Sequence, residues 1–148
     1  MLPRILVAGT ADAIDMVKGV LGEEAELVVA RSVEEAVRQI EANLRAVVCN
    51  LRFDDSRMFN FLQALREHPA GAALCVVSIR TGRHALSSNL RHSITNALDA
   101  LGVDYFVDLQ QLTERYGEEV ARETLRQILL GQSPANPDHR LSSAASRS

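Results

Sequence analysis

The chain has 148 residues, of which 47% are hydrophobic and 24% charged, so we expect one globular domain and not a disordered chain. The net charge of −3 predicts no bulk attraction to nucleic acid. No stretch approaches the roughly 18 apolar residues of a membrane span, and the early apolar run is broken at Thr10 and Asp12. We therefore expect a cytoplasmic protein without a signal peptide.

The predicted elements alternate between short apolar strands and amphipathic helices. In chain order they are a strand at 4–8, a helix at 11–22, a strand at 26–30, a helix at 32–44, a strand at 46–50, a helix that closes at 68–71, a strand at 73–78, a helix at 86–102, a strand at 104–107 and helical residues to 130 that Gly117 can interrupt. Thr10 or Asp12 is expected to cap the first helix, and Ser32 with Glu35 forms a capping box for the second.

Continuous apolar strands separated by amphipathic helices predict an α/β fold with a parallel sheet covered on both faces. Right-handed crossovers then give a three-layer, doubly wound, five-stranded parallel sheet in the flavodoxin-like order 2-1-3-4-5. We assign this domain to residues 1–131. Residues 132–148 are rich in Ser, Ala and Pro and are predicted to form a disordered polar tail.

In such a fold, function concentrates at the carboxyl ends of the strands. The residues at or just after four of these ends are Gly9, Thr10, Asn50, Ser78 and Asp108. With this element order, residues 3–130 resemble the receiver domain of two-component response regulators. The family has an acidic pair that binds Mg²⁺ after the first strand, a phosphoacceptor Asp after the third, Ser or Thr after the fourth and Lys after the fifth.

The resemblance implies a degenerate phosphorylation pocket in this chain. The acidic pair falls on Gly9 and Thr10, the phosphoacceptor on Asn50, the hydroxyl on Ser78 and the lysine on Asp108. Acids hold the hard cation and a carboxylate attacks phosphorus, so only Ser78 keeps the family's chemistry. The sole lysine of the chain, at position 18, lies in the first predicted helix and cannot replace the missing one.

Asn50 has two interpretations: a mimic of one state of the acceptor that bonds Ser78 or a loop carbonyl, or a residue that satisfies backbone groups at a strand end. We favour the second. Asp54 and Asp55 are expected to cap the helix that follows them.

A basic cluster of Arg80, Arg83 and His84 follows the fourth strand, with Gly82 allowing a tight loop. One interpretation is an anion-binding site of guanidinium groups near a helix N-terminus. The other, which we favour, is a solvated loop whose arginines pair with a nearby aspartate, namely Asp54, Asp55 or Asp108.

The sequence predicts no metal site and no cofactor. Cys49 and Cys75 lie in apolar runs and are interpreted as reduced core residues, and His84 and His92 lie two helical turns apart. No GxGxxG or GxSxG motif follows a predicted strand.

Two functional hypotheses remain. The first is a non-catalytic, receiver-like signalling module that is not phosphorylated at the usual site. It contacts a protein partner or forms a homodimer through the fourth predicted helix, the fifth strand and the last helix, without nucleic acid or membrane. The second is a binding protein or enzyme for a small anion, such as phosphate or a nucleotide, which uses the crevice at the strand ends.

Overall fold

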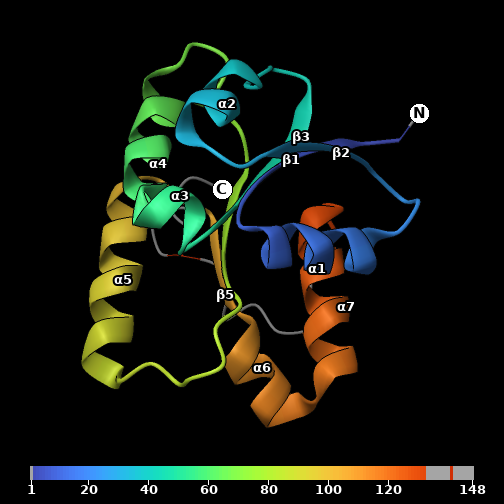
Figure 1. Cartoon of the computed structure of the whole chain (residues 1–148), viewed down its shortest axis with the longest axis vertical. Helices are drawn as coiled ribbons and strands as arrows, with labels where there is room; N and C mark the ends of the chain where they lie inside the picture. The colour runs from blue at the N-terminus through green and yellow to red at the C-terminus, as the bar shows by residue number, and fades with distance from the viewer. Residues whose placement is uncertain (1, 133–140, 142–148) are drawn as a thin grey trace.

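The computed structural model describes residues 2–132 and residue 141. Its centre is a five-stranded sheet in the order β2-β1-β3-β4-β5, in which every neighbouring pair is parallel (Figure 1). The strands are β1 (Arg4–Ala8), β2 (Glu26–Ala30), β3 (Leu44–Asn50), β4 (Val76–Arg80) and β5 (Tyr105–Asp108). The predicted fold class and strand order are confirmed.

Helices cover both faces of this sheet, which makes the fold three-layered (Figure 1). The helices are α1 (Ala11–Leu21), α2 (Val33–Arg38), α3 (Phe53–Ser56), α4 (Met58–Glu67), α5 (Ser88–Ala100), α6 (Leu109–Tyr116) and α7 (Glu118–Leu129). Helices α2, α4 and α5 lie over one face, and α1, α6 and α7 contribute the buried residues of the other.

The core is divided into two apolar clusters, one on each side of the sheet. Successive side chains of a strand alternate between them: Leu6 and Ala8 join the cluster under α4, whereas Ile5 and Val7 join the cluster under α1 and α7. Both faces are buried, which explains why the strands read as continuous apolar runs.

Several element boundaries differ from the sequence prediction, whereas the interruption expected in the last helical segment is present. Leu44 belongs to β3 and not to the second helix, because it is buried and pairs with Arg4 across the β1–β3 ladder. Strand β4 runs two residues further than predicted, to Arg80. Gly117, with a φ of 93°, separates α6 from α7, so the interruption expected there is present.

Local capping follows the sequence prediction at one helix and departs from it at another. The Ser32 hydroxyl accepts a hydrogen bond from the Glu35 backbone N–H at 3.1 Å, as predicted for the start of α2. Asp54 was expected to cap the helix after it, which is wrong: its Oδ2 accepts from the Val33 N–H at 2.8 Å and caps α2 instead. Helix α4 has no side-chain cap.

The predicted disordered tail lies almost wholly outside the described residues. Leu141 is described, and its N–H donates to the Asp104 carbonyl at 2.9 Å, while its side chain packs against the α4-side core cluster. Within the described part of the chain, no helix has both the length and the hydropathy needed to cross a bilayer.

Gly71 and Gly19 provide an opposed pair of alanine substitutions. A Cβ at Gly71 would lie 2.2 Å from the Leu65 carbonyl oxygen, so Gly71→Ala should lower the free energy of unfolding by about 1–3 kcal/mol. Gly19 is exposed within α1, and a Cβ there would meet only the end of the Arg122 side chain. Gly19→Ala should therefore raise the free energy of unfolding by up to about 1 kcal/mol. Urea denaturation measures both, and equal effects would contradict this packing.

Candidate functional site

The polar residues predicted at the strand ends lie along one edge of the sheet. In the strand register, Asn50 of β3 is opposite Ile79 of β4, Ser78 is opposite Cys49, and Arg80 is opposite Asp108 of β5. Asn50, Ser78 and Asp108 are all buried, although most buried side chains in the described chain are apolar. This edge is therefore the candidate functional site.

Asn50 is held by Thr10, which follows β1. The Asn50 Oδ1 accepts a hydrogen bond from the Thr10 N–H at 3.2 Å, and the Asn50 Nδ2 donates to the Thr10 hydroxyl at 3.3 Å. The same hydroxyl donates to Asp12 Oδ1 at 2.7 Å, so a polar chain connects β3 with the start of α1. Asn50 satisfies the backbone at a strand end, the interpretation that we favoured.

Gly9 allows this arrangement because it approaches the amide closely. A Cβ at position 9 would lie 3.1 Å from Asn50 Oδ1 and 3.3 Å from the Ala13 Cβ, which is tighter than ordinary contact. A larger side chain at Gly9 would press against the amide that bonds Thr10.

Ser78 takes no part in this polar chain. Its hydroxyl is fully buried and lies 3.3 Å from the Met58 sulfur on the α4 side of the sheet. Within the described part of the chain, the Asn50 side chain bonds Thr10 and not Ser78. The structure therefore brings Asn50 and Thr10 together and leaves the serine in the apolar core.

Asp108 is the centre of a second polar group. Its side chain is 3% exposed; Oδ1 accepts from Arg80 at 3.2 Å, and Oδ2 accepts from Arg91 at 2.6 Å. Oδ1 also accepts from the Gln111 N–H at 3.3 Å, which caps α6. A buried carboxylate needs such partners, because an unpaired buried charge is strongly destabilising.

Arg91 was not identified as a site residue from the sequence. It lies in the first turn of α5 and reaches Asp108 across the sheet edge, 17 residues away in the chain. The sequence offered one indication of this role, which is that Arg91 is in the first turns of a helix that follows the fourth strand. Pairing it with Asp108 required the tertiary arrangement.

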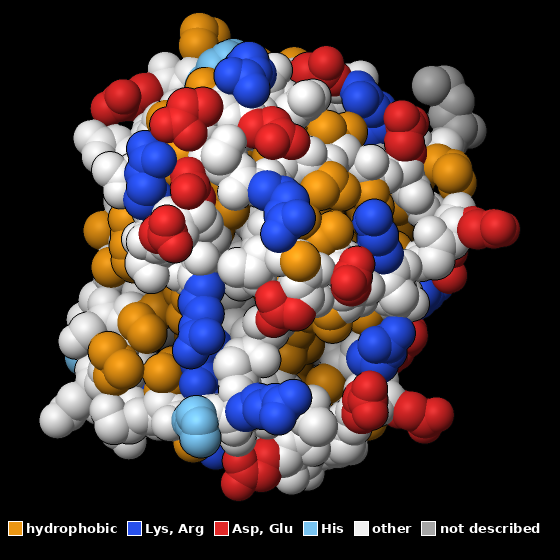
Figure 2. Space-filling model, in the orientation of Figure 1, with side chains coloured by type: hydrophobic (Ala, Val, Ile, Leu, Met, Phe, Trp, Pro, Cys, Tyr) orange, Lys and Arg blue, Asp and Glu red, His pale blue; other side chains and the backbone are white. Residues whose placement is uncertain are grey.

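The basic loop after β4 divides between two environments. Arg80 is turned inward: it pairs with Asp108, and its guanidinium also donates to the His84 carbonyl. Arg83 and His84 instead line a cavity of about 300 Å³ with Asp12, Arg52, Thr81 and Gly82. In the lower part of Figure 2, near the end of the sheet at which β4 and β5 finish, basic side chains and a histidine lie among acidic side chains.

Asp12 is the single carboxylate of this cavity. The hydrogen bond from the Thr10 hydroxyl lowers the pKa of Asp12 below the usual 3.8, and the nearby Arg52 charge contributes in the same direction, whereas partial burial opposes them. Asp12 is therefore ionised at neutral pH and attracts Arg52.

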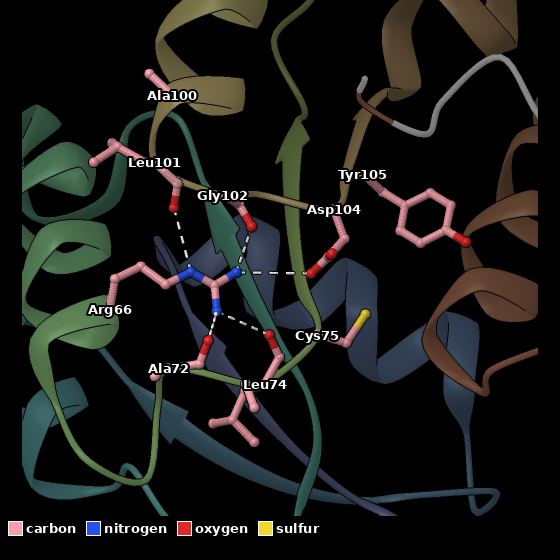
Figure 3. Close-up of a pocket in the computed structure, with 10 residues that line it drawn as sticks. Arg66, Ala72, Leu74, Cys75, Ala100, Leu101, Gly102, Asp104 and Tyr105 are labelled. Carbon is pink, nitrogen blue, oxygen red and sulfur yellow. Dashed lines mark hydrogen bonds and ion pairs between the residues drawn. The ribbon is translucent and has the colours of Figure 1, made fainter. Parts of the chain in front are cut away.

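A larger cavity of about 740 Å³ lies at the opposite edge of the sheet and is lined in part by Arg66, Cys75 and Tyr105 (Figure 3). The Arg66 guanidinium is fully engaged within the chain. It donates to the backbone carbonyls of Leu101, Gly102, Gly71, Ala72 and Leu74, and its Nη2 lies 3.7 Å from Asp104 Oδ2. Arg66 therefore ties the end of α4 to the segments that precede β4 and β5.

Comparisons with known proteins support the fold. No protein-family model matches the chain, and no curated protein matches it by sequence. Among solved structures, the chemotaxis response regulator CheY4 of Vibrio cholerae is similar with a TM-score of 0.64 at 14% identity, covering 86% of this chain and 99% of that protein.

Two other solved structures show the same likeness. A response regulator from Hahella chejuensis has a TM-score of 0.65 at 16% identity, with 86% of this chain and 95% of that one covered. The phosphorylated cyanobacterial phytochrome response regulator RcpA has a TM-score of 0.64 at 15% identity, with 92% and 100% covered. The chain therefore has the fold of response-regulator receiver domains, as the resemblance implied.

The charge network around Asp108 can be tested by stability. Asp108→Asn removes the carboxylate while Arg80 and Arg91 remain, so the free energy of unfolding should fall by about 2–4 kcal/mol. Glu34→Gln is the matched control, because Glu34 pairs with Arg57 at the exposed surface and should lose less than about 1 kcal/mol. Equal losses in urea denaturation would show that the Asp108 network is not a buried anchor.

Proposed function

We propose that this chain is a receiver-like regulatory module that acts through protein contacts and is not phosphorylated at the end of its third strand. The receiver-domain fold supports the signalling class, since solved response regulators share the arrangement over most of both chains. The residues at the strand ends support the absence of phosphotransfer.

The observation that carries this proposal is the pairing of Asp108 with Arg80 and Arg91. The family resemblance puts a lysine at position 108, where its charge would stabilise phosphoryl oxygens. Asp108 has the opposite charge, and both of its oxygens are already occupied by arginines and a backbone N–H. Position 108 therefore offers no cationic side chain to stabilise phosphoryl oxygens.

The acceptor position is equally unsuited to the reaction. The Asn50 amide is not a useful nucleophile, and both of its polar atoms are bonded to Thr10. Gly9 and Thr10 provide no carboxylate ligand for Mg²⁺. The strand-end residues support a fixed polar structure and not a transferred phosphoryl group.

The proposed contact surface is formed by α5, β5 and α7. Strand β5 is at the edge of the sheet, α5 buries only Leu98 among its residues, and its Leu90 is 50% exposed. Val120 of α7 is 46% exposed. Exposed apolar side chains beside an edge strand are suited to a protein partner or a second copy of the chain.

Phosphorylation can be measured directly by intact mass after incubation with acetyl phosphate and Mg²⁺. We expect no added phosphoryl group on the wild type, and none on Asn50→Asp, because the metal ligands and the lysine would still be missing. A known phosphorylatable receiver is the positive control. A gain of one phosphoryl group by the wild type would contradict the proposal.

The homodimer form of the contact is tested by light scattering over a range of concentrations. The wild type should reach the mass of a dimer, and Leu90→Arg should shift it toward the monomer, because a charge would be buried at the contact. Leu2→Arg is the matched control, since Leu2 is 53% exposed and lies outside α5, β5 and α7. A wild type that stays monomeric at every concentration contradicts the homodimer.

A further inference from the structure

We propose that the cavity at the strand ends, lined in part by Arg52, Arg83 and His84, binds a phosphoryl-type oxyanion without covalent chemistry. The ligand class is inorganic phosphate or a small phosphate monoester. The remaining lining residues are Asp12, Thr81 and Gly82. The lining of this cavity does not include Asn50, Ser78 or Asp108, although Asp12 is connected to Asn50 through Thr10.

The cavity is assembled from segments that follow neighbouring strands. Arg52 comes from the segment after β3, Arg83 and His84 come from the loop after β4, and Asp12 lies in the first turn of α1 after β1. Strands β1, β3 and β4 are adjacent in the sheet, and their parallel direction brings these loops to one edge. Residues far apart in the chain therefore line a common space.

Arg80 supports the loop that carries two of these residues. Its side chain is only 11% exposed; it pairs with Asp108 and donates to the His84 carbonyl. Gly82 passes close beside it, since a Cβ at that position would lie 3.2 Å from the Arg80 guanidinium. The inward-facing Arg80 thus acts as a positioning residue, while Arg83 and His84 remain on the cavity side.

The charges of the cavity favour an anion. Within the described part of the chain, the side chains of Arg52 and Arg83 make no hydrogen bond or ion pair, so their donors are available. The one carboxylate, Asp12, already accepts the Thr10 hydroxyl through Oδ1. Two guanidinium groups against one carboxylate leave a net positive charge even when His84 is neutral.

The size and composition of the cavity identify the kind of anion. A volume of about 300 Å³ is at the lower end of small-molecule pockets. None of the six lining residues is a Phe, Tyr or Trp on which a nucleobase could stack, or a large apolar side chain. Guanidinium forks match the oxygens of phosphate in a bidentate manner, and the Thr81 hydroxyl adds a further donor. These features fit a compact phosphoryl group better than a nucleotide.

Calorimetric titration with inorganic phosphate and with glycerol phosphate, at constant ionic strength, tests the proposal. Both ligands should bind the wild type at millimolar concentrations or below. Arg52→Gln and Arg83→Gln should each weaken binding about tenfold or more, because each removes a charged donor. Arg38→Gln is the matched control: Arg38 is exposed at the end of α2, outside the cavity, and should leave binding unchanged.

Backbone amide shifts in NMR spectra locate the ligand independently of the variants. Phosphate should move the amides of residues 81–84 and of Arg52, while those of α4 and α7 stay in place. Absence of binding at millimolar phosphate, equal weakening by Arg38→Gln, or retained binding in the double variant Arg52→Gln/Arg83→Gln would overturn the proposal. Tighter binding of AMP than of both phosphates would also overturn it.

This test is independent of the proposed regulatory function. Reversible phosphate binding leaves the intact mass unchanged, whereas phosphorylation of the chain increases it. A covalent product would therefore contradict the proposed function and leave this inference standing. Failure to bind phosphate would contradict this inference and leave the proposed function standing.

Discussion

The buried carboxylate of Asp108 organises the polar residues at the carboxyl ends of β4 and β5. A carboxylate that is 3% exposed needs counter-charges and hydrogen-bond donors. They are Arg80 from the adjacent strand, Arg91 from α5 and the backbone N–H of Gln111 in the first turn of α6. One side chain therefore connects β4, β5, α5 and α6. The orientation of Arg80, and with it the course of the loop to His84, follows from this demand.

A second edge group, Asn50 with Thr10, satisfies its polar atoms without any charge at its centre. Asn50 both donates to and accepts from one residue, and the Thr10 hydroxyl donates a hydrogen bond to Asp12 Oδ1. Asn50 is thus held by neutral hydrogen bonds, whereas Asp108 is held by ion pairs. In both, the polar atoms are directed at other parts of the same chain.

The fold was predictable because its signal is local and repeated: apolar strands alternate with amphipathic helices. The details that failed depend on tertiary contacts. Leu44 reads as part of a helical stripe and becomes a strand residue because Arg4 pairs with it, and Asp54 caps a helix 21 residues earlier because the loop folds back on α2. At the site, the sequence identified Gly9, Thr10, Asn50, Ser78 and Asp108. It did not identify Met58 and Arg91, which bond Ser78 and Asp108 from distant elements.

The Asp108 network also constrains the order in which this edge could change during evolution. A lysine introduced at position 108 would place three cations together with no carboxylate between them, since Arg80 and Arg91 both converge there. Arg80 and Arg91 would have to be replaced first, and each earlier step would leave Asp108 with fewer counter-charges. The network therefore couples positions 80, 91 and 108, so that the effect of a substitution at one of them depends on the residues at the other two.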